Sequence, residues 1–166
     1  PPRSTLFPYT TLFRSETDKN KLLEKQLEIL AQIVPLHKKL QDEGRIELST
    51  TPFYHPIIPL LVDEKSVLEA IPNAPLPRRT NSMAGDALTQ IKTAYEYHEH
   101  KFGKAPKGMW PSEGSISQEA AELFCSAGVQ WIATDQINLS RSRSHIPVAE
   151  RHHFRPYRVK GITGNL

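Results

Sequence analysis

Cysteine is almost absent from this sequence: Cys125 is the single example among 166 residues. A lone cysteine excludes an intrachain disulfide framework and a cysteine metal cluster. Cys125 follows Leu123 and Phe124 in an apolar run with helical spacing. We therefore predict a small buried side chain at this position rather than a nucleophile.

The sequence also lacks long apolar stretches and a strong charge of one sign. No run approaches the roughly 20 apolar residues that span a bilayer, so we expect no membrane partner and a soluble, cytoplasmic protein. The formal net charge of +3 is too small to indicate a nucleic acid partner. Basic residues crowd the C-terminal part, but Phe154 and Tyr157 give them little aromatic support. We interpret this charge as solvated surface.

Histidine is plentiful by contrast, with seven in the chain. His98 and His100 stand two residues apart in an expected helix, so they point to different faces. His152 and His153 are adjacent and are equally poorly placed to share one ion. We therefore expect no metal site from these pairs.

Helical and extended patterns alternate along the chain, which is typical of parallel α/β architecture. We predict helices over residues 16–43, 57–62, 63–70, 86–102 and 118–128, strands over residues 46–49, 109–110 and 129–133, and an irregular proline-rich connection over residues 71–79. Pro35 should bend or split the first helix. Gly44 should stop that helix, and Ser117 should cap the last one.

Functional side chains follow each of the three predicted strands. Tyr54 and His55 come after the first strand, Trp110 to Glu113 after the second, and Asp135 after the third. The carboxyl ends of parallel strands meet at one edge, where α/β proteins collect functional groups. We therefore expect these side chains to converge on one rim.

Residues 110–115 (WPSEGS) place the carboxylate of Glu113 near the indole of Trp110, in a turn ahead of a helix. A carboxylate there can act as nucleophile, acid or base, and an indole offers a flat apolar surface on which sugar rings stack. The alternative is a carboxylate that stabilises the N-terminus of the following helix.

Two ordered blocks carry a family resemblance. Residues 108–117 (GMWPSEGSIS), followed by residues 131–135 (WIATD), resemble the amylase-like branch of glycoside hydrolase family 57. Residues 44–61 (GRIELSTTPFYHPIIPLL) resemble an upstream conserved region of the same family. The resemblance runs from about Lys21 to Val159, and the family's first conserved region, a His-containing strand, has no counterpart here.

This resemblance implies an α/β fold in which the chain forms part of a (β/α)7-type barrel with parallel strands. It also implies a retaining enzyme acting on α-glucans, either an amylase-like hydrolase or a glucanotransferase, that uses no metal or organic cofactor. Glu113 matches the catalytic nucleophile, and the acid/base Asp belongs to a later strand, beyond Leu166. Oligomeric state is left open.

The sequence and the resemblance together also indicate roles for other candidate residues. We expect His55 to contact a sugar hydroxyl or to pack as a loop histidine, with the resemblance favouring the contact. We place Trp110 against a sugar ring. Asp135 should position substrate or bind backbone N–H groups at the strand end, whereas Trp131 should lie in the core.

The ends of the chain indicate a fragment. Residues 5–15 (TLFPYTTLFRS) resemble a translated sequencing adapter, so we interpret residues 1–15 as non-native and residues 16–166 as a piece of a catalytic barrel truncated at both ends. A complete barrel typically needs roughly 250 residues. We expect the chain alone to be inactive and poorly stable, because a partial barrel leaves strand edges unpaired.

Two alternatives remain open at this stage. A metal-dependent polysaccharide deacetylase on a related barrel would need an Asp and two His around one ion, and no convincing grouping of that kind is seen. A non-catalytic carbohydrate-binding relative would retain oligosaccharide binding without the acid/base residue.

Overall fold

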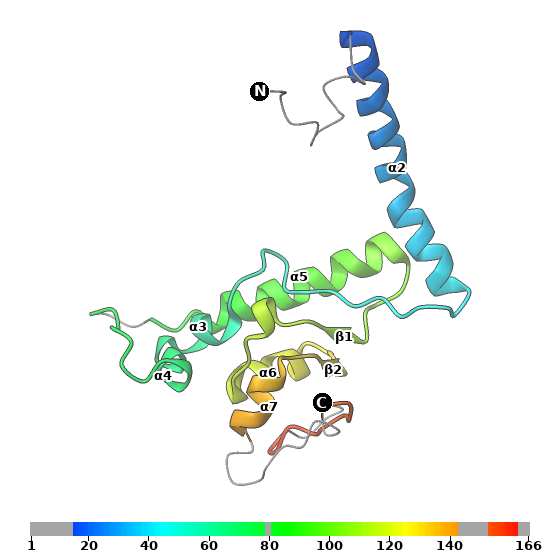
Figure 1. The fold of residues 1–166 in the computed structure, drawn as a ribbon. Coiled ribbons are helices and arrows are strands. Elements are labelled where there is room, and N and C mark those ends of the chain that lie inside the picture. Colours follow the sequence, from blue (N-terminus) through cyan, green and yellow to red (C-terminus); the bar gives the residue numbers. More distant parts are fainter. Residues whose placement is uncertain (1–14, 79–80, 143–152, 163–166) are drawn as a thin grey trace. The chain divides into compact units, whose positions relative to one another are not determined.

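The computed structural model describes residues 15–78, 81–142 and 153–162 (Figure 1). The chain divides into two compact units, Pro1–Glu47 and Leu48–Leu166. Almost all of the segment interpreted as adapter-derived lies outside the described residues, as do Arg79 and His152. Among the helices in the described ranges, none combines the length and apolar character needed to cross a bilayer.

The described residues of the first unit form a long helix, α2, Glu16–Asp42. Ser15 caps it by accepting a hydrogen bond from the Asp18 backbone N–H, and Gly44 follows its end with φ of 69°. The predicted helix is confirmed. Of the two effects predicted for Pro35, a bend or a split, the split is wrong, because α2 continues through Pro35. None of its residues is buried, so its apolar side chains remain accessible.

The second unit is built around short parallel extended segments. Strands β1, Gly108–Met109, and β2, Trp131–Ile132, pair in parallel, with Gly108 opposite Trp131. Thr50 forms a parallel bridge to Met109, and the Trp110 N–H donates to the Thr50 carbonyl at 2.8 Å. The predicted parallel arrangement is confirmed for β1 and β2, and the first segment joins them only through Thr50, one residue beyond its predicted end.

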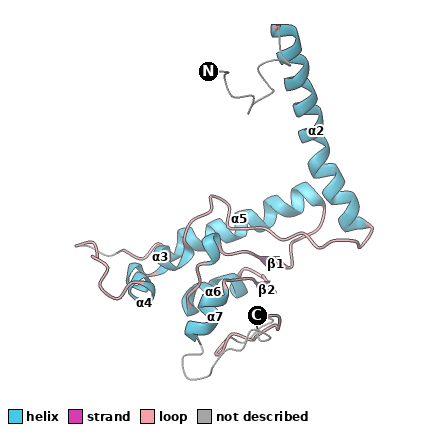
Figure 2. Cartoon of the chain, viewed as in Figure 1, coloured by secondary structure: helices cyan, strands magenta, loops and turns pink. Residues whose placement is uncertain are grey.

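The predicted strand boundaries need correction. Residues 46–49 form no strand, because the pairing of this segment is confined to Thr50. The second strand begins one residue earlier than predicted, and the third is shorter than residues 129–133. Figure 2 shows how short the strands are beside the helices. The mixed α/β character is confirmed, and the barrel stays a prediction.

Helices and short helical turns surround the strands. They are α3, Ile58–Val62, η1, Glu64–Ser66, α4, Val67–Ala70, α5, Ala84–Phe102, η2, Ser112–Gly114, α6, Gln118–Ser126, and α7, Gln136–Ser142. Ser117 caps α6 as predicted, accepting from the Ala120 N–H, and residues 71–78 contain no helix or strand. The sequence prediction missed α7.

The core of the second unit lies where α3, α5, β1 and α6 meet. Ile58, Ile91, Met109 and Phe124 are almost completely buried there, and Val129 joins them. The buried positions of α5 include Ala87, Ile91 and Ala94, the apolar face that its spacing predicts. Cys125 is half-buried against this core.

Trp131 is not the core residue that we predicted, because 38% of its surface is exposed. Its indole lies over Gly108, the residue opposite it in the parallel pair, and a Cβ at Gly108 would overlap the ring. The smallest residue at position 108 therefore lets the indole lie flat on β1 at the surface of the sheet.

Candidate functional site

Glu113 occupies the centre of the short turn η2, between the buried residues Ser112 and Gly114. Its backbone is left-handed, with φ of 55° and ψ of 21°, and its side chain is 73% exposed. Since α6 begins at Gln118, the alternative of a carboxylate in the first turn of that helix is wrong. The turn buries its backbone and holds the carboxylate out toward solvent.

His55 lies beside this carboxylate, although 58 residues separate the two in sequence. The distance from His55 Nε2 to Glu113 Oε1 is 3.0 Å, and the distance from His55 Nδ1 to Thr51 Oγ1 is 3.2 Å. Both ring nitrogens of His55 are therefore engaged. The imidazole links the loop after Thr50 to the turn after β1.

The backbone of this loop is anchored on α5. Gln90 of α5 accepts from the Phe53 N–H through its backbone carbonyl, at 3.1 Å, and from the Tyr54 N–H through its side chain, at 3.0 Å. The His55 N–H donates to the Pro52 carbonyl at 2.9 Å, and Pro52 is buried. These bonds fix where the imidazole can reach.

Strain concentrates at this contact. His55, with φ of 57°, and Glu113, with φ of 55°, are the non-glycine residues with positive φ in the part of the chain that the structure describes. Left-handed backbone at such residues costs on the order of 1–3 kcal/mol each and tends to gather at functional sites. The two strained residues are also the two that contact each other.

Trp110 lies close to the same turn. Its indole Cζ2 is 3.4 Å from the position that a Cβ would take at Gly114, and 42% of its surface is exposed. Gly114 itself has φ of 67°, a conformation that favours glycine. The indole thus packs on the backbone of the Glu113 turn and keeps part of its surface open.

Asp135 begins α7 and binds backbone N–H groups. Its Oδ1 accepts from the Ile137 N–H at 2.6 Å, and its carbonyl accepts from the Asn138 N–H at 3.1 Å. Asn138 Nδ2 in turn donates to the Gly114 carbonyl at 2.9 Å, and the Thr134 hydroxyl donates to that same carbonyl. The segment after β2 is therefore tied to the Glu113 turn.

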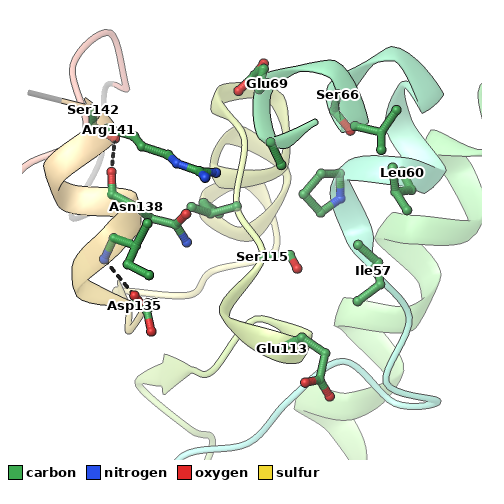
Figure 3. A pocket seen from close by; sticks show the side chains of 15 residues that line it. Ile57, Leu60, Ser66, Glu69, Glu113, Ser115, Asp135, Asn138, Arg141 and Ser142 are labelled. Carbon is green, nitrogen blue, oxygen red and sulfur yellow. Dashed lines mark hydrogen bonds between the residues drawn. The ribbon is translucent and has the colours of Figure 1, made fainter. Parts of the chain in front are cut away.

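A groove of about 670 Å³ opens beside Glu113 (Figure 3). One wall comes from α3, η1 and α4, and the other from α7. Figure 3 shows the Arg141 side chain extending from α7 toward the middle of the groove, with Glu113 at one end. The lining residues are Ile57, Pro59, Leu60, Ser66, Val67, Glu69, Ala70, Glu113, Ser115, Ile116, Asp135, Ile137, Asn138, Arg141 and Ser142.

The family model described as Glycosyl hydrolase family 57 matches residues 13–163. The chain belongs to this family. It is 28% identical over 98 residues to "Alpha-amylase 1" of Dictyoglomus thermophilum. This match covers 59% of this chain and 11% of that protein. It also resembles the crystal structure of the alpha-amylase AmyC from Thermotoga maritima, with 20% identity, a TM-score of 0.47 and coverage of 72% of this chain and 19% of the other. The chain thus spans about a tenth to a fifth of the length of these relatives.

In this family 57 chain, the structure brings together most of the side chains that the sequence singled out. Glu113 and Asp135 both line the groove, and His55 contacts Glu113 without lining it. Trp110 is likewise absent from the lining and packs beneath the turn at Gly114. Of the two roles considered for Asp135, the structure contains the contact with backbone N–H groups.

The sequence prediction missed Thr51, Thr134, Asn138 and Arg141. An Asp shortly after a strand is a favoured N-cap residue, and this signal could have revealed α7 with Asn138 and Arg141. No comparable signal marks Thr51, since its contact with His55 depends on the orientation of the imidazole ring in the folded protein. Within residues 15–78, 81–142 and 153–162, no group of three or more His, Cys, Asp or Glu side chains is arranged to hold a metal ion.

Proposed function

We propose that the whole protein is a retaining glycoside hydrolase of the amylase type that acts on α-glucans, with Glu113 as the nucleophile. Family membership supports the reaction class. The observation that carries the proposal is the Glu113 carboxylate, which is exposed beside a groove and held on one side by the His55 imidazole. A nucleophilic carboxylate must be accessible and oriented, and Glu113 is both.

Retention of configuration requires two displacements. Ionised Glu113 attacks the anomeric carbon and forms a glycosyl ester while the bond to the leaving oxygen breaks. A carboxylic acid on the other side of the bond protonates that oxygen and then activates water to hydrolyse the ester. We propose that this second group is an Asp from a later barrel strand, supplied by sequence beyond Leu166, at a separation of roughly 5–5.5 Å between the carboxyl groups.

The groove is suited to a glucan chain. It combines apolar walls from Ile57, Leu60 and Ile137 with amide, guanidinium and carboxylate groups that can bind sugar hydroxyls. Trp110 offers an exposed part of its indole near Glu113, where a sugar ring can stack. We propose that glucose units on one side of the cleaved bond occupy this groove.

The test is replacement of Glu113 by Gln in the whole protein. The amide keeps the size of the side chain but cannot attack, so we expect kcat on a maltooligosaccharide to fall by at least about a thousandfold. Glu119→Gln is the matched control, because Glu119 is an exposed carboxylate of α6 outside the groove lining. This control should retain the activity of the unmodified protein.

Chemical rescue separates a nucleophile from a general base. In Glu113→Gly, azide should restore cleavage by attacking the anomeric carbon in place of the carboxylate, and the product should be a glycosyl azide of inverted configuration. Full activity of Glu113→Gln would refute the assignment. If the unmodified protein binds maltooligosaccharides by calorimetry but releases no sugar, the carbohydrate-binding alternative holds instead.

A further inference from the structure

The contacts of His55 extend beyond Glu113. Nδ1 of the ring lies 3.2 Å from Thr51 Oγ1, and Nε2 lies 3.0 Å from Glu113 Oε1. The three side chains thus form a continuous series from the loop after Thr50 to the turn after β1. We propose that Thr51 is a positioning residue that orients His55, so that Nε2–H donates to the Glu113 carboxylate.

The direction of each hydrogen bond follows from the chemistry of the groups. An ionised carboxylate can only accept, so Nε2 of His55 carries the hydrogen. In a neutral imidazole, Nδ1 is then an acceptor, and its partner must donate. The Thr51 hydroxyl is that donor, since it holds one hydrogen and can rotate to aim it.

A hydroxyl also suits the other protonation state of the ring. When the imidazole is charged, both nitrogens donate, and Thr51 Oγ1 can accept through a lone pair. An apolar side chain of the same shape could do neither. Thr51 therefore keeps the ring in one orientation whether or not the histidine is charged.

The backbone of the loop makes this contact specific. Thr51 and His55 are four residues apart, and the left-handed φ of 57° at His55 turns its side chain back toward Thr51. The two bonds to Gln90 and the bond from His55 N–H to the Pro52 carbonyl hold the residues between them. The left-handed backbone at His55 thus orients its ring toward Thr51.

The consequence for Glu113 rests on the proposed function. The bond from His55 occupies Oε1, and no other hydrogen bond to the Glu113 carboxylate occurs among the described residues. Because the bond from His55 draws electron density from Oε1, we expect Oε2 to be the oxygen that attacks the anomeric carbon. Once the ester forms through Oε2, Nε2–H still donates to Oε1, which has become the ester carbonyl.

The first experiment needs no activity. The whole protein, labelled with ¹⁵N at histidine, is examined by two-bond ¹H–¹⁵N correlation at pH 8, where an ordinary imidazole is neutral. His55→Gln identifies the His55 signals by their loss. We expect a protonated Nε2 and a hydrogen-bonded, unprotonated Nδ1 that moves downfield in Thr51→Val and returns in Thr51→Ser. A protonated Nδ1 in the unmodified chain, or an Nδ1 signal unchanged in Thr51→Val, would overturn the proposal.

The second experiment measures turnover in the whole protein. Thr51→Val should lower kcat about tenfold with KM nearly unchanged, at the low end of what bonds that orient metal-bound histidines contribute, and Thr51→Ser should restore it. Thr89→Val is the control, because the exposed Thr89 bonds its own helix at the Gly85 carbonyl. A matching loss in Thr51→Ser, or an equal rise of KM that explains the whole effect, would contradict the positioning role. An inactive unmodified protein with the expected ¹⁵N pattern would refute the proposed function and leave the orientation of His55 intact.

Discussion

At the scale of single residues, burial and strain occur at different histidines. His55 is half-exposed and strained, with both nitrogens paired. His98 is 4% exposed on α5, and its Nδ1–H donates to the Lys104 carbonyl at 3.1 Å, while its Nε2 has no hydrogen-bond partner among the described residues. Burial lowers the pKa of His98 below its ordinary value of 6.5, against the opposing effect of the Lys104 bond.

His98 therefore predicts how stability depends on pH. Below pH 6.5 the unfolded chain takes up a proton at this residue while the folded chain does not, until the pH reaches the lowered pKa. The contribution of His98 to the free energy of unfolding should be fully present above pH 6.5. Between pH 6.5 and the lowered pKa of His98, the free energy of unfolding should fall by up to about 1.4 kcal/mol per pH unit. Urea unfolding of the chain at pH 8, 7, 6 and 5 measures this slope.

The control uses the other histidine of the same helix end. His98→Gln should remove this part of the pH dependence, whereas His100→Gln should keep it, because His100 is exposed. Equal slopes in all three proteins would show that His98 titrates alike in the folded and unfolded states.

At the scale of elements, the candidate site depends on how strand ends are tied together. The Thr134 hydroxyl and the Asn138 amide both donate to the Gly114 carbonyl, so the start of α7 holds the turn that carries Glu113. Asn138 Nδ2 also lies 2.7 Å from Thr134 Oγ1. Gly114 is buried, so the loss of one of the two donors to its carbonyl should be unfavourable.

We expect Asn138→Asp to weaken this connection. The variant keeps the shape of the side chain but replaces the donor with an oxygen that faces the Gly114 carbonyl. The free energy of unfolding should therefore fall by roughly 1–3 kcal/mol. The shift in urea midpoint measures the loss. Ser126→Ala is the control, because it removes a similar bond, to the Leu123 carbonyl, on the exposed end of α6. A shift no larger than that of the control would contradict the role of Asn138.

At the scale of the whole molecule, the two units differ in how they are stabilised. The second unit buries Ile58, Ile91, Met109 and Phe124 in one core. The helix α2 buries no residue, although Leu27 and Leu30 are apolar, and surface pairs such as Lys25 with Glu28 add only a few tenths of a kcal/mol. A helix without packing depends on its own weak propensity.

Hydrogen exchange of the 166-residue chain should reveal this difference. Amides of α2 should exchange with little protection, while those in the middle of α5 and α6 should exchange slowly, because they open only with the core. The comparison is internal to one sample and needs no variant. Protection of α2 equal to that of α5 would show that α2 is packed in solution.

Much of the secondary structure could be predicted because the interactions that form it are local. Ser117 caps α6 through a bond to a nearby N–H group, and the apolar spacing of α5 identifies its buried face. The positions of His55, Glu113 and Asp135 after extended segments followed from the same alternation. The roles of these residues stay predictions.

The sequence by itself determined most of the helices, the cap at Ser117 and the order in which functional residues follow the extended segments, since these depend on neighbours within one or two turns. Only the tertiary structure decided that Trp131 lies exposed over Gly108 and that Asn138 holds Gly114. It alone joined Thr51, His55 and Glu113. These contacts need left-handed backbone at His55 and Glu113, a conformation disfavoured locally and maintained by bonds from distant segments.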